Sequence, residues 1–137
     1  MKSLYQFETW DNSMNGTIPP QVGNATAIKT LIIHTNKYTG TIPSSIGQLY
    51  NSIGLYFFNN FLTGTLPSTL SNLTEPDAFD VSNNLLDGSV PDTLMQLTSL
   101  TTLELSTNGF SGVLPQDLGN LKKLRTLTIN GVLKSLL

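Results

Sequence analysis

The chain has no cysteine among its 137 residues, so disulfide bonds, a cysteine nucleophile and cysteine metal ligands are all excluded. Only 12% of the residues are charged and the net charge is −2, whereas a nucleic-acid partner requires a concentrated basic surface. No stretch approaches the roughly 20 apolar residues of a membrane-spanning helix. No apolar run follows Met1 as it would in a signal peptide. We therefore predict that this segment does not bind nucleic acid and does not insert directly into a membrane.

The chain does have an internal repeat of 24 residues. An asparagine, a glycine four residues later and a proline three residues after that recur at a constant step. The three columns are Asn12, Asn36, Asn60, Asn84 and Asn108; Gly16, Gly40, Gly64, Gly88 and Gly112; and Pro19, Pro43, Pro67, Pro91 and Pro115. A fixed period of this length predicts a solenoid, in which each repeat packs on its neighbours. Residues 1–137 are therefore expected to form a single array of five repeats and a partial sixth.

Each repeat begins with a short alternating pattern. Apolar residues stand five and three places before the asparagine, as Leu31 and Ile33 do, which is typical of a strand with one buried face. The glycine permits a tight bend. The asparagine is predicted to point inward, where its amide satisfies backbone groups of its own and adjacent rungs. We therefore expect the five asparagines to form a structural ladder.

Two positions depart from the repeat. Most repeats have leucine or isoleucine eight places before the asparagine, but Ser52 and Pro76 stand there in the third and fourth repeats. This predicts local distortion on the convex side of both repeats, with Ile53 taking the place of Ser52 in the core. After the sixth strand, Val132 and Leu136 replace the asparagine and the glycine.

The repeat resembles the plant-specific subtype of the leucine-rich repeat family. The family pattern appears as LIIHTNKYTGTIPSSIGQL from Leu31 to Leu49. The resemblance implies a right-handed curved superhelix with a concave parallel β-sheet of about six short strands and irregular or 3₁₀ turns on the convex side. The repeats resemble those of receptor-like ectodomains, which implies an extracellular or cell-surface location as part of a larger protein. The absence of recognisable caps leads us to expect a segment of a longer array, whose uncapped ends favour self-association. Residues 132–137 are an alternative, makeshift cap.

Residues that alternate with the core positions are predicted to face the concave surface. They are aromatic and apolar in the first three repeats and partly acidic in the next two: Trp10, Ile32, His34, Tyr56, Phe58, Asp80 and Glu104. Aromatic residues with a polar border are typical of a protein interface. We predict that this surface binds a protein or peptide ligand. The alternative is that the aromatic rings only stabilise the sheet by cross-strand packing.

No constellation of residues indicates catalysis, a cofactor or a metal. His34 is the only histidine, and its nearest expected carboxylates are Glu8 and Asp11. Ser82, the serine that a triad would need, is two strands away, about 10 Å. We therefore predict a protein that is not an enzyme, with a solvated His34. Sequons for N-glycosylation occur at Asn15, Asn24 and Asn72, and they permit an extracellular location without establishing it.

Two other functions stay open at this point. Resemblance to the family's polygalacturonase inhibitors allows an inhibitor of a cell-wall enzyme, which would rely on a charged concave surface. A flanking column of hydroxyl residues, Thr17, Thr41, Thr65 and Ser89, is similar to the surface of ice-binding solenoids. However, threonine or serine beside this glycine is ordinary in the subtype, and Val113 interrupts the column.

Overall fold

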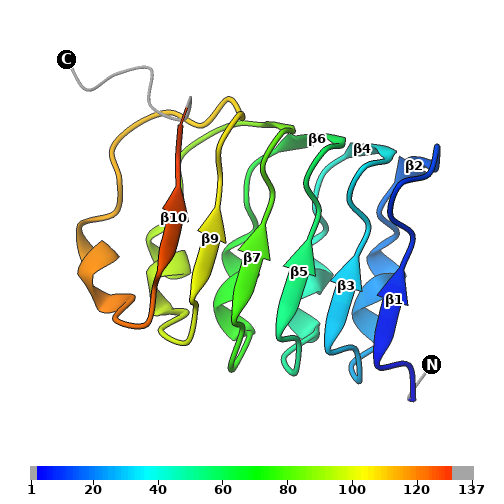
Figure 1. The fold of residues 1–137 in the computed structure, drawn as a ribbon, viewed down its shortest axis with the longest axis horizontal. Helices are drawn as coiled ribbons and strands as arrows, with labels where there is room; N and C mark the ends of the chain where they lie inside the picture. The colour runs from blue at the N-terminus through cyan, green and yellow to red at the C-terminus, as the bar shows by residue number, and fades with distance from the viewer. Residues whose placement is uncertain (1–2, 131–137) are drawn as a thin grey trace.

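The computed structural model describes residues 3–130 as a stack of similar rungs (Figure 1). Within these residues the chain forms ten short strands and five 3₁₀ helices. The strands are β1 (Gln6–Glu8), β2 (Asn15–Thr17), β3 (Thr30–Ile32), β4 (Lys37–Gly40), β5 (Gly54–Tyr56), β6 (Phe61–Gly64), β7 (Ala78–Asp80), β8 (Leu85–Leu86), β9 (Thr102–Glu104) and β10 (Thr126–Thr128). The 3₁₀ helices are η1 (Pro20–Asn24), η2 (Ser44–Gln48), η3 (Ser68–Asn72), η4 (Asp92–Gln96) and η5 (Gln116–Asn120).

The main sheet contains six parallel strands in the order β1-β3-β5-β7-β9-β10. Its register follows the repeat, because each residue pairs with the one 24 positions later, as Phe7 does with Leu31 and Leu31 with Leu55. The 3₁₀ helices lie behind this sheet (Figure 1). The predicted parallel sheet and the 3₁₀ turns are therefore confirmed. We call the surface of the main sheet that faces away from the core the concave face.

A second parallel sheet, in the order β2-β4-β6-β8, lies along one edge of the stack. The repeat pattern by itself does not predict this second sheet. Its register is shorter, since Gly16 pairs with Tyr38, 22 positions later. The strands of this sheet follow the bend at the asparagine, so each of the first four rungs passes from one sheet into the other.

The bend uses two left-handed residues in each rung. One is the repeat glycine, with φ of +71° at Gly40 and +74° at Gly64, which confirms its predicted role in turning the chain. The other immediately precedes the ladder asparagine, with φ of +55° at Thr35 and +54° at Asn59. A side chain at such a φ is strained unless it is asparagine or aspartate, so the second position was not evident from residue type alone.

The core is one continuous column of apolar side chains. Phe57 is fully buried and meets the ring of Phe79 edge to face, with centroids 6.4 Å apart and an interplanar angle of 82°. The same alternating positions are less covered in the outer rungs, where Phe7 is 39% exposed and Leu127 is only partly buried. Burial thus comes from neighbouring rungs, as expected for a solenoid.

The two departures from the repeat behave differently. Ile53 does not take the place of Ser52, and that prediction is wrong: Ser52 is 1% exposed and Ile53 is 47% exposed. The Ser52 hydroxyl donates a 3.0 Å hydrogen bond to the carbonyl oxygen of Ile28, so the polar group is satisfied inside the core. The third repeat also keeps its turn, since the amide of Ser52 donates to the carbonyl oxygen of Leu49 at 2.8 Å.

The fourth repeat is distorted, as the sequence predicts. Pro76 is buried in the same column but has no N–H with which to close the turn that Ser52 closes in the previous repeat. The residue after η3, Leu73, accordingly has an extended ψ of 132°, against 48° at Leu49 and 62° at Leu97. Residues 132–137, including the expected cap and the departures at Val132 and Leu136, lie outside the described residues. Within residues 3–130, no helix is long and apolar enough to cross a membrane.

Candidate functional site

Three aromatic side chains form a stacked row on the concave face. The indole of Trp10 lies 6.0 Å from the imidazole of His34, and the imidazole lies 4.0 Å from the ring of Phe58, with interplanar angles of 22° and 11°. The three residues occupy the same position in successive rungs, just beyond β1, β3 and β5. Trp10 is 51% exposed, while His34 and Phe58 are half-buried. Cross-strand packing and an accessible aromatic surface are therefore both present at this row.

A second row runs beside the first along the paired strands. Its residues follow one another in register: Ile32, Tyr56, Asp80 and Glu104. All four are half-buried. The row begins at the exposed Glu8, which pairs with Ile32, and then passes from apolar to acidic residues, with Tyr56 directly beside Asp80.

Gly54 is a residue of this surface that the sequence analysis missed. A Cβ placed on Gly54 would lie 2.6 Å from Cε2 of Tyr56, so the phenol ring lies down over the glycine. The corresponding residues of β3 and β9 are Thr30 and Thr102. The signal available in the sequence was this glycine two residues before the tyrosine, the single glycine of its column.

Asp80 is held on the concave face by two hydrogen bonds from Ser82. Its Oδ1 accepts hydrogen bonds from the backbone amide of Ser82 at 2.9 Å and from the Ser82 hydroxyl at 2.7 Å. Burial raises the pKa of the Asp80 carboxyl above its ordinary value, and the neighbouring Glu104 raises it further, while the bonds from Ser82 act in the opposite direction. The carboxylate is thus held in place although its environment disfavours its charge.

His34 differs from the solvated side chain that the sequence predicts. Burial in the stack lowers the pKa of the imidazole, against the opposing effect of the carboxylates of Asp80, Asp11 and Glu8, in that order. Its Nδ1 lies 3.1 Å from the Thr35 hydroxyl. Among residues 3–130, no cluster of three histidine, aspartate or glutamate side chains has the arrangement needed to hold a metal ion.

The asparagine column makes repeated hydrogen bonds between rungs. The Asn60 Nδ2 donates to the carbonyl oxygens of Ile33 and Phe57, both at 3.0 Å, and its Oδ1 accepts from the amide of Tyr38 at 3.0 Å. Asn36, Asn84 and Asn108 bond in the same way to their own and the preceding rung. Asn12 is exposed and donates to the carbonyl oxygen of Trp10. The last four asparagines therefore each join their own rung to the preceding one, whereas Asn12 bonds within the first rung.

The threonine column beside the second sheet has a packing role. A Cβ placed on Gly40 would lie 2.9 Å from Cγ2 of Thr17, and one placed on Gly64 would lie 2.9 Å from Cγ2 of Thr41. The methyl group of each threonine thus occupies the space left by the next glycine. This contact gives the two columns a packing reason to occur together.

The three sequon asparagines are all exposed. Asn15 lies at the start of β2, and Asn24 and Asn72 end η1 and η3. Each side chain is therefore accessible to modification.

The second sheet also exposes two apolar side chains, Phe61 by 51% and Leu85 by 58%. The repeat pattern did not indicate this apolar pair.

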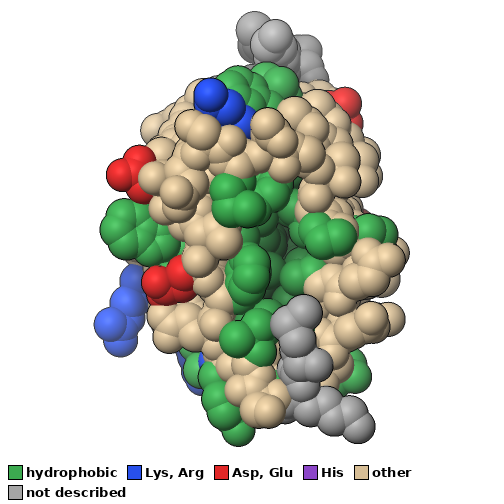
Figure 2. Space-filling model, turned by 90° about the vertical axis from the view of Figure 1, so that its right-hand side faces the viewer, with side chains coloured by type: hydrophobic (Ala, Val, Ile, Leu, Met, Phe, Trp, Pro, Cys, Tyr) green, Lys and Arg blue, Asp and Glu red, His purple; other side chains and the backbone are tan. Residues whose placement is uncertain are grey.

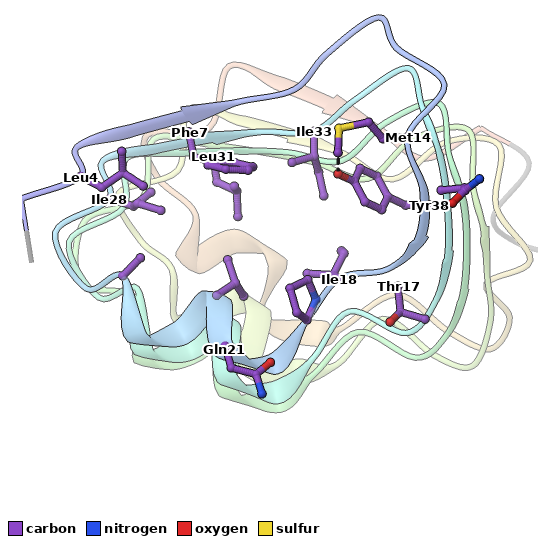
Figure 3. A pocket seen from close by; sticks show the side chains of 14 residues that line it. Leu4, Phe7, Met14, Thr17, Ile18, Gln21, Ile28, Leu31, Ile33 and Tyr38 are labelled. Carbon is purple, nitrogen blue, oxygen red and sulfur yellow. Dashed lines mark hydrogen bonds between the residues drawn. The ribbon is translucent and has the colours of Figure 1, made fainter. Parts of the chain in front are cut away.

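An apolar hollow of about 400 Å³ opens at the N-terminal end of the stack. Figure 2 shows hydrophobic side chains around this depression. In Figure 3, Phe7, Leu31 and Ile33 lie on one side of it and Ile18 on the other, and the Tyr38 hydroxyl bonds to Met14 Sδ at 3.6 Å. These are core positions of the first two rungs, so the hollow is the end of the core and not a separate site. Self-association through the ends stays a prediction.

Comparison with known proteins shows similarity to a leucine-rich repeat family model and to solved receptor structures. The family model described as Leucine Rich Repeat matches residues 53–73 and 99–121. No curated protein matches the chain. Three similar solved structures are those of PEPR1–AtPEP1, of the ectodomain of the Arabidopsis thaliana receptor kinase GASSHO1/SCHENGEN3 with CASPARIAN STRIP INTEGRITY FACTOR 2, and of the Arabidopsis receptor kinase HAESA with the peptide hormone IDA and the co-receptor SERK1.

The likeness extends over most of this chain but a small part of each receptor. Sequence identities are 42%, 33% and 29%, and TM-scores are 0.84, 0.91 and 0.90, in the same order. The matches cover 86%, 93% and 95% of this chain. The chain spans only 17%, 15% and 22% of the length of those proteins.

Proposed function

Since this chain belongs to the leucine-rich repeat family, in its plant-specific subtype, we propose that it is a non-catalytic module that binds a protein or peptide ligand on its concave face. The observation that carries the proposal is the stacked row of Trp10, His34 and Phe58. Rigid aromatic side chains on an accessible sheet provide contact area at a low cost in conformational entropy.

The solved relatives support the same function. The GASSHO1/SCHENGEN3 and HAESA structures are complexes with CASPARIAN STRIP INTEGRITY FACTOR 2 and the peptide hormone IDA, respectively. We propose that this chain is likewise part of a longer array and of a cell-surface ectodomain. The comparisons do not favour an enzyme inhibitor or an ice-binding protein.

The test needs a ligand, which a random peptide library displayed on phage can supply. Peptides selected on the immobilised chain are expected to bind it and to lose about 1–3 kcal/mol of binding free energy to each of the variants Trp10→Ala and Phe58→Ala. Both side chains are on the surface row, so circular dichroism should show an intact fold. The matched controls are Thr17→Val and Thr41→Val, which keep the methyl group that packs on the next glycine. Loss of binding in these controls, with no loss in the aromatic variants, would place the ligand on the flank and overturn the proposal.

A further inference from the structure

The concave face has carboxylates but no basic side chain at its strand positions. The segments that form it are residues 6–11, 30–35, 54–59, 78–83, 102–107 and 126–130, and they contain neither lysine nor arginine. Their charged residues are Glu8, Asp11, Asp80 and Glu104. The nearest basic residues along the chain, Lys29 and Arg125, stand just before β3 and β10 at the border of the sheet. The field over the centre of the face therefore attracts a cation.

Asp80 is the carboxylate best placed to meet a ligand. It is half-buried and lies in register between Tyr56 and Glu104. Both of its hydrogen bonds from Ser82 end on Oδ1, and within residues 3–130 no protein donor is found on Oδ2. No ion pair within those residues offsets its charge. A lysine or arginine of a ligand would supply both the donor and the opposite charge that the fold does not provide.

The aromatic row runs across the strands toward this carboxylate, and His34 is its middle member. Neighbouring strands are about 4.8 Å apart, so the rungs of His34 and Asp80, two strands apart, are separated by about 10 Å. An extended peptide advances about 3.3 Å per residue. A peptide that crosses the strands therefore spans the interval from His34, at the middle of the aromatic row, to Asp80 in about three residues.

We infer that the ligand of the concave face is an extended peptide segment with an aromatic or large apolar anchor on the Trp10–His34–Phe58 row and a lysine or arginine about three residues away at Asp80. The inference rests on the proposed function and specifies the ligand that this face selects. The raised pKa of Asp80 agrees with it, because a carboxylate whose charge the fold disfavours gains most from an external cation. Glu104, in the next strand, adds to the attraction.

The peptides selected on the chain test this inference directly. Their sequences are expected to be enriched in lysine or arginine at two to four residues from an aromatic or large apolar residue. The strongest peptide is then synthesised in two forms, one with its basic residue and one with glutamine in its place. Against the basic form, Asp80→Asn is expected to weaken binding about tenfold, as for loss of a partly desolvated charge pair, and against the glutamine form to have little effect.

Two variants serve as controls. Asp87→Asn makes the same change of charge at an exposed residue after β8, outside the concave face, and should leave binding unchanged. Asp80→Lys, used in a new selection, should reverse the preference toward acidic peptides. Circular dichroism confirms that each variant is folded.

The outcomes separate this inference from the proposed function. In one outcome, binding is lost in Phe58→Ala but Asp80→Asn binds both peptide forms as the parent chain does. The concave face is then the binding site, and the inference of a basic ligand residue at Asp80 is wrong. If the selected peptides bind Phe58→Ala and Asp80→Asn as tightly as the parent chain, or if the selection enriches no peptide, both proposals are overturned.

Discussion

The imidazole of His34 lies against the ring of Phe58, with centroids 4.0 Å apart and planes 11° from parallel. The contact removes one face of the imidazole from water, which disfavours its protonated form. It also joins the second and third rungs on the concave face. The ionisation of His34 is thus a reporter of the state of the aromatic row.

The first prediction is that Phe58→Leu raises the pKa of His34 toward its ordinary value of 6.5, because a smaller side chain re-exposes the imidazole. In the parent chain the folded-state pKa lies below the unfolded one, so the contribution of His34 to stability is present above pH 6.5 and is lost as the pH falls through the folded-state pKa. NMR titration of the single histidine measures its pKa in the parent chain and in the variant. An unchanged pKa in the variant would show that Phe58 does not desolvate the ring.

The second prediction is that Asp80→Asn raises the free energy of unfolding at pH 7. Burial raises the folded-state pKa of Asp80 above its unfolded value of 3.8, so its contribution to stability is fully present below pH 3.8 and is lost as the pH rises through the folded-state pKa. Asparagine cannot ionise, and its Oδ1 still accepts from Ser82. Urea unfolding should show a gain at pH 7 that disappears near pH 3. A variant less stable than the parent at pH 7 would mean that the hydrogen bonds to the charged carboxylate outweigh its burial.

The third prediction concerns the asparagine ladder. Asn60→Leu should lower the free energy of unfolding by about 1–3 kcal/mol, because the amide of Tyr38 loses its acceptor inside the core. The carbonyl oxygens of Ile33 and Phe57 each lose one of their two asparagine donors. Urea midpoints measure the change. The matched control is Asn59→Gly at the exposed neighbour, since glycine accepts the φ of +54° found there, whereas leucine would add strain. Equal losses in the two variants would contradict the inward position of Asn60.

The fourth prediction compares two glycines of one column on the convex side. A Cβ on Gly47 would lie 2.2 Å from the backbone oxygen of Thr69, because η2 and η3 stack closely, whereas no atom lies within 4 Å of one on Gly119. Gly47→Ala should therefore lower the free energy of unfolding by about 1–3 kcal/mol, as for overpacking in a core. Gly119→Ala should have little effect on the urea midpoint. Similar midpoints for both variants would mean that the 3₁₀ helices are free to move apart.

A large part of the fold follows from the periodicity of the sequence. The 24-residue step predicts the register of the main sheet, because each rung repeats the apolar positions of the previous one, and pairs such as Leu31 and Leu55 confirm it. The repeat glycines predict a tight bend in each rung, and their positive φ agrees with it. These features are local or strictly periodic, so the residue types alone determine them.

The tertiary structure decided what depends on unequal neighbours. Ser52 remains in the core because the carbonyl oxygen of Ile28 in the preceding rung accepts its hydroxyl, and no property of Ser52 or Ile53 alone predicts that contact. The second sheet likewise depends on how the bends of successive rungs lie together.

The same division applies to the candidate site. The sequence alone determined that Trp10, His34 and Phe58 share one column, because their spacing is the repeat itself. Only the tertiary structure decided that the rings of His34 and Phe58 stack, that Tyr56 lies over Gly54 and that Asp80 is held by Ser82. Periodicity specifies which residues stand side by side, whereas side-chain rotamers and burial specify how they meet. The chemistry of the concave face therefore depends on packing that a repeat pattern does not encode.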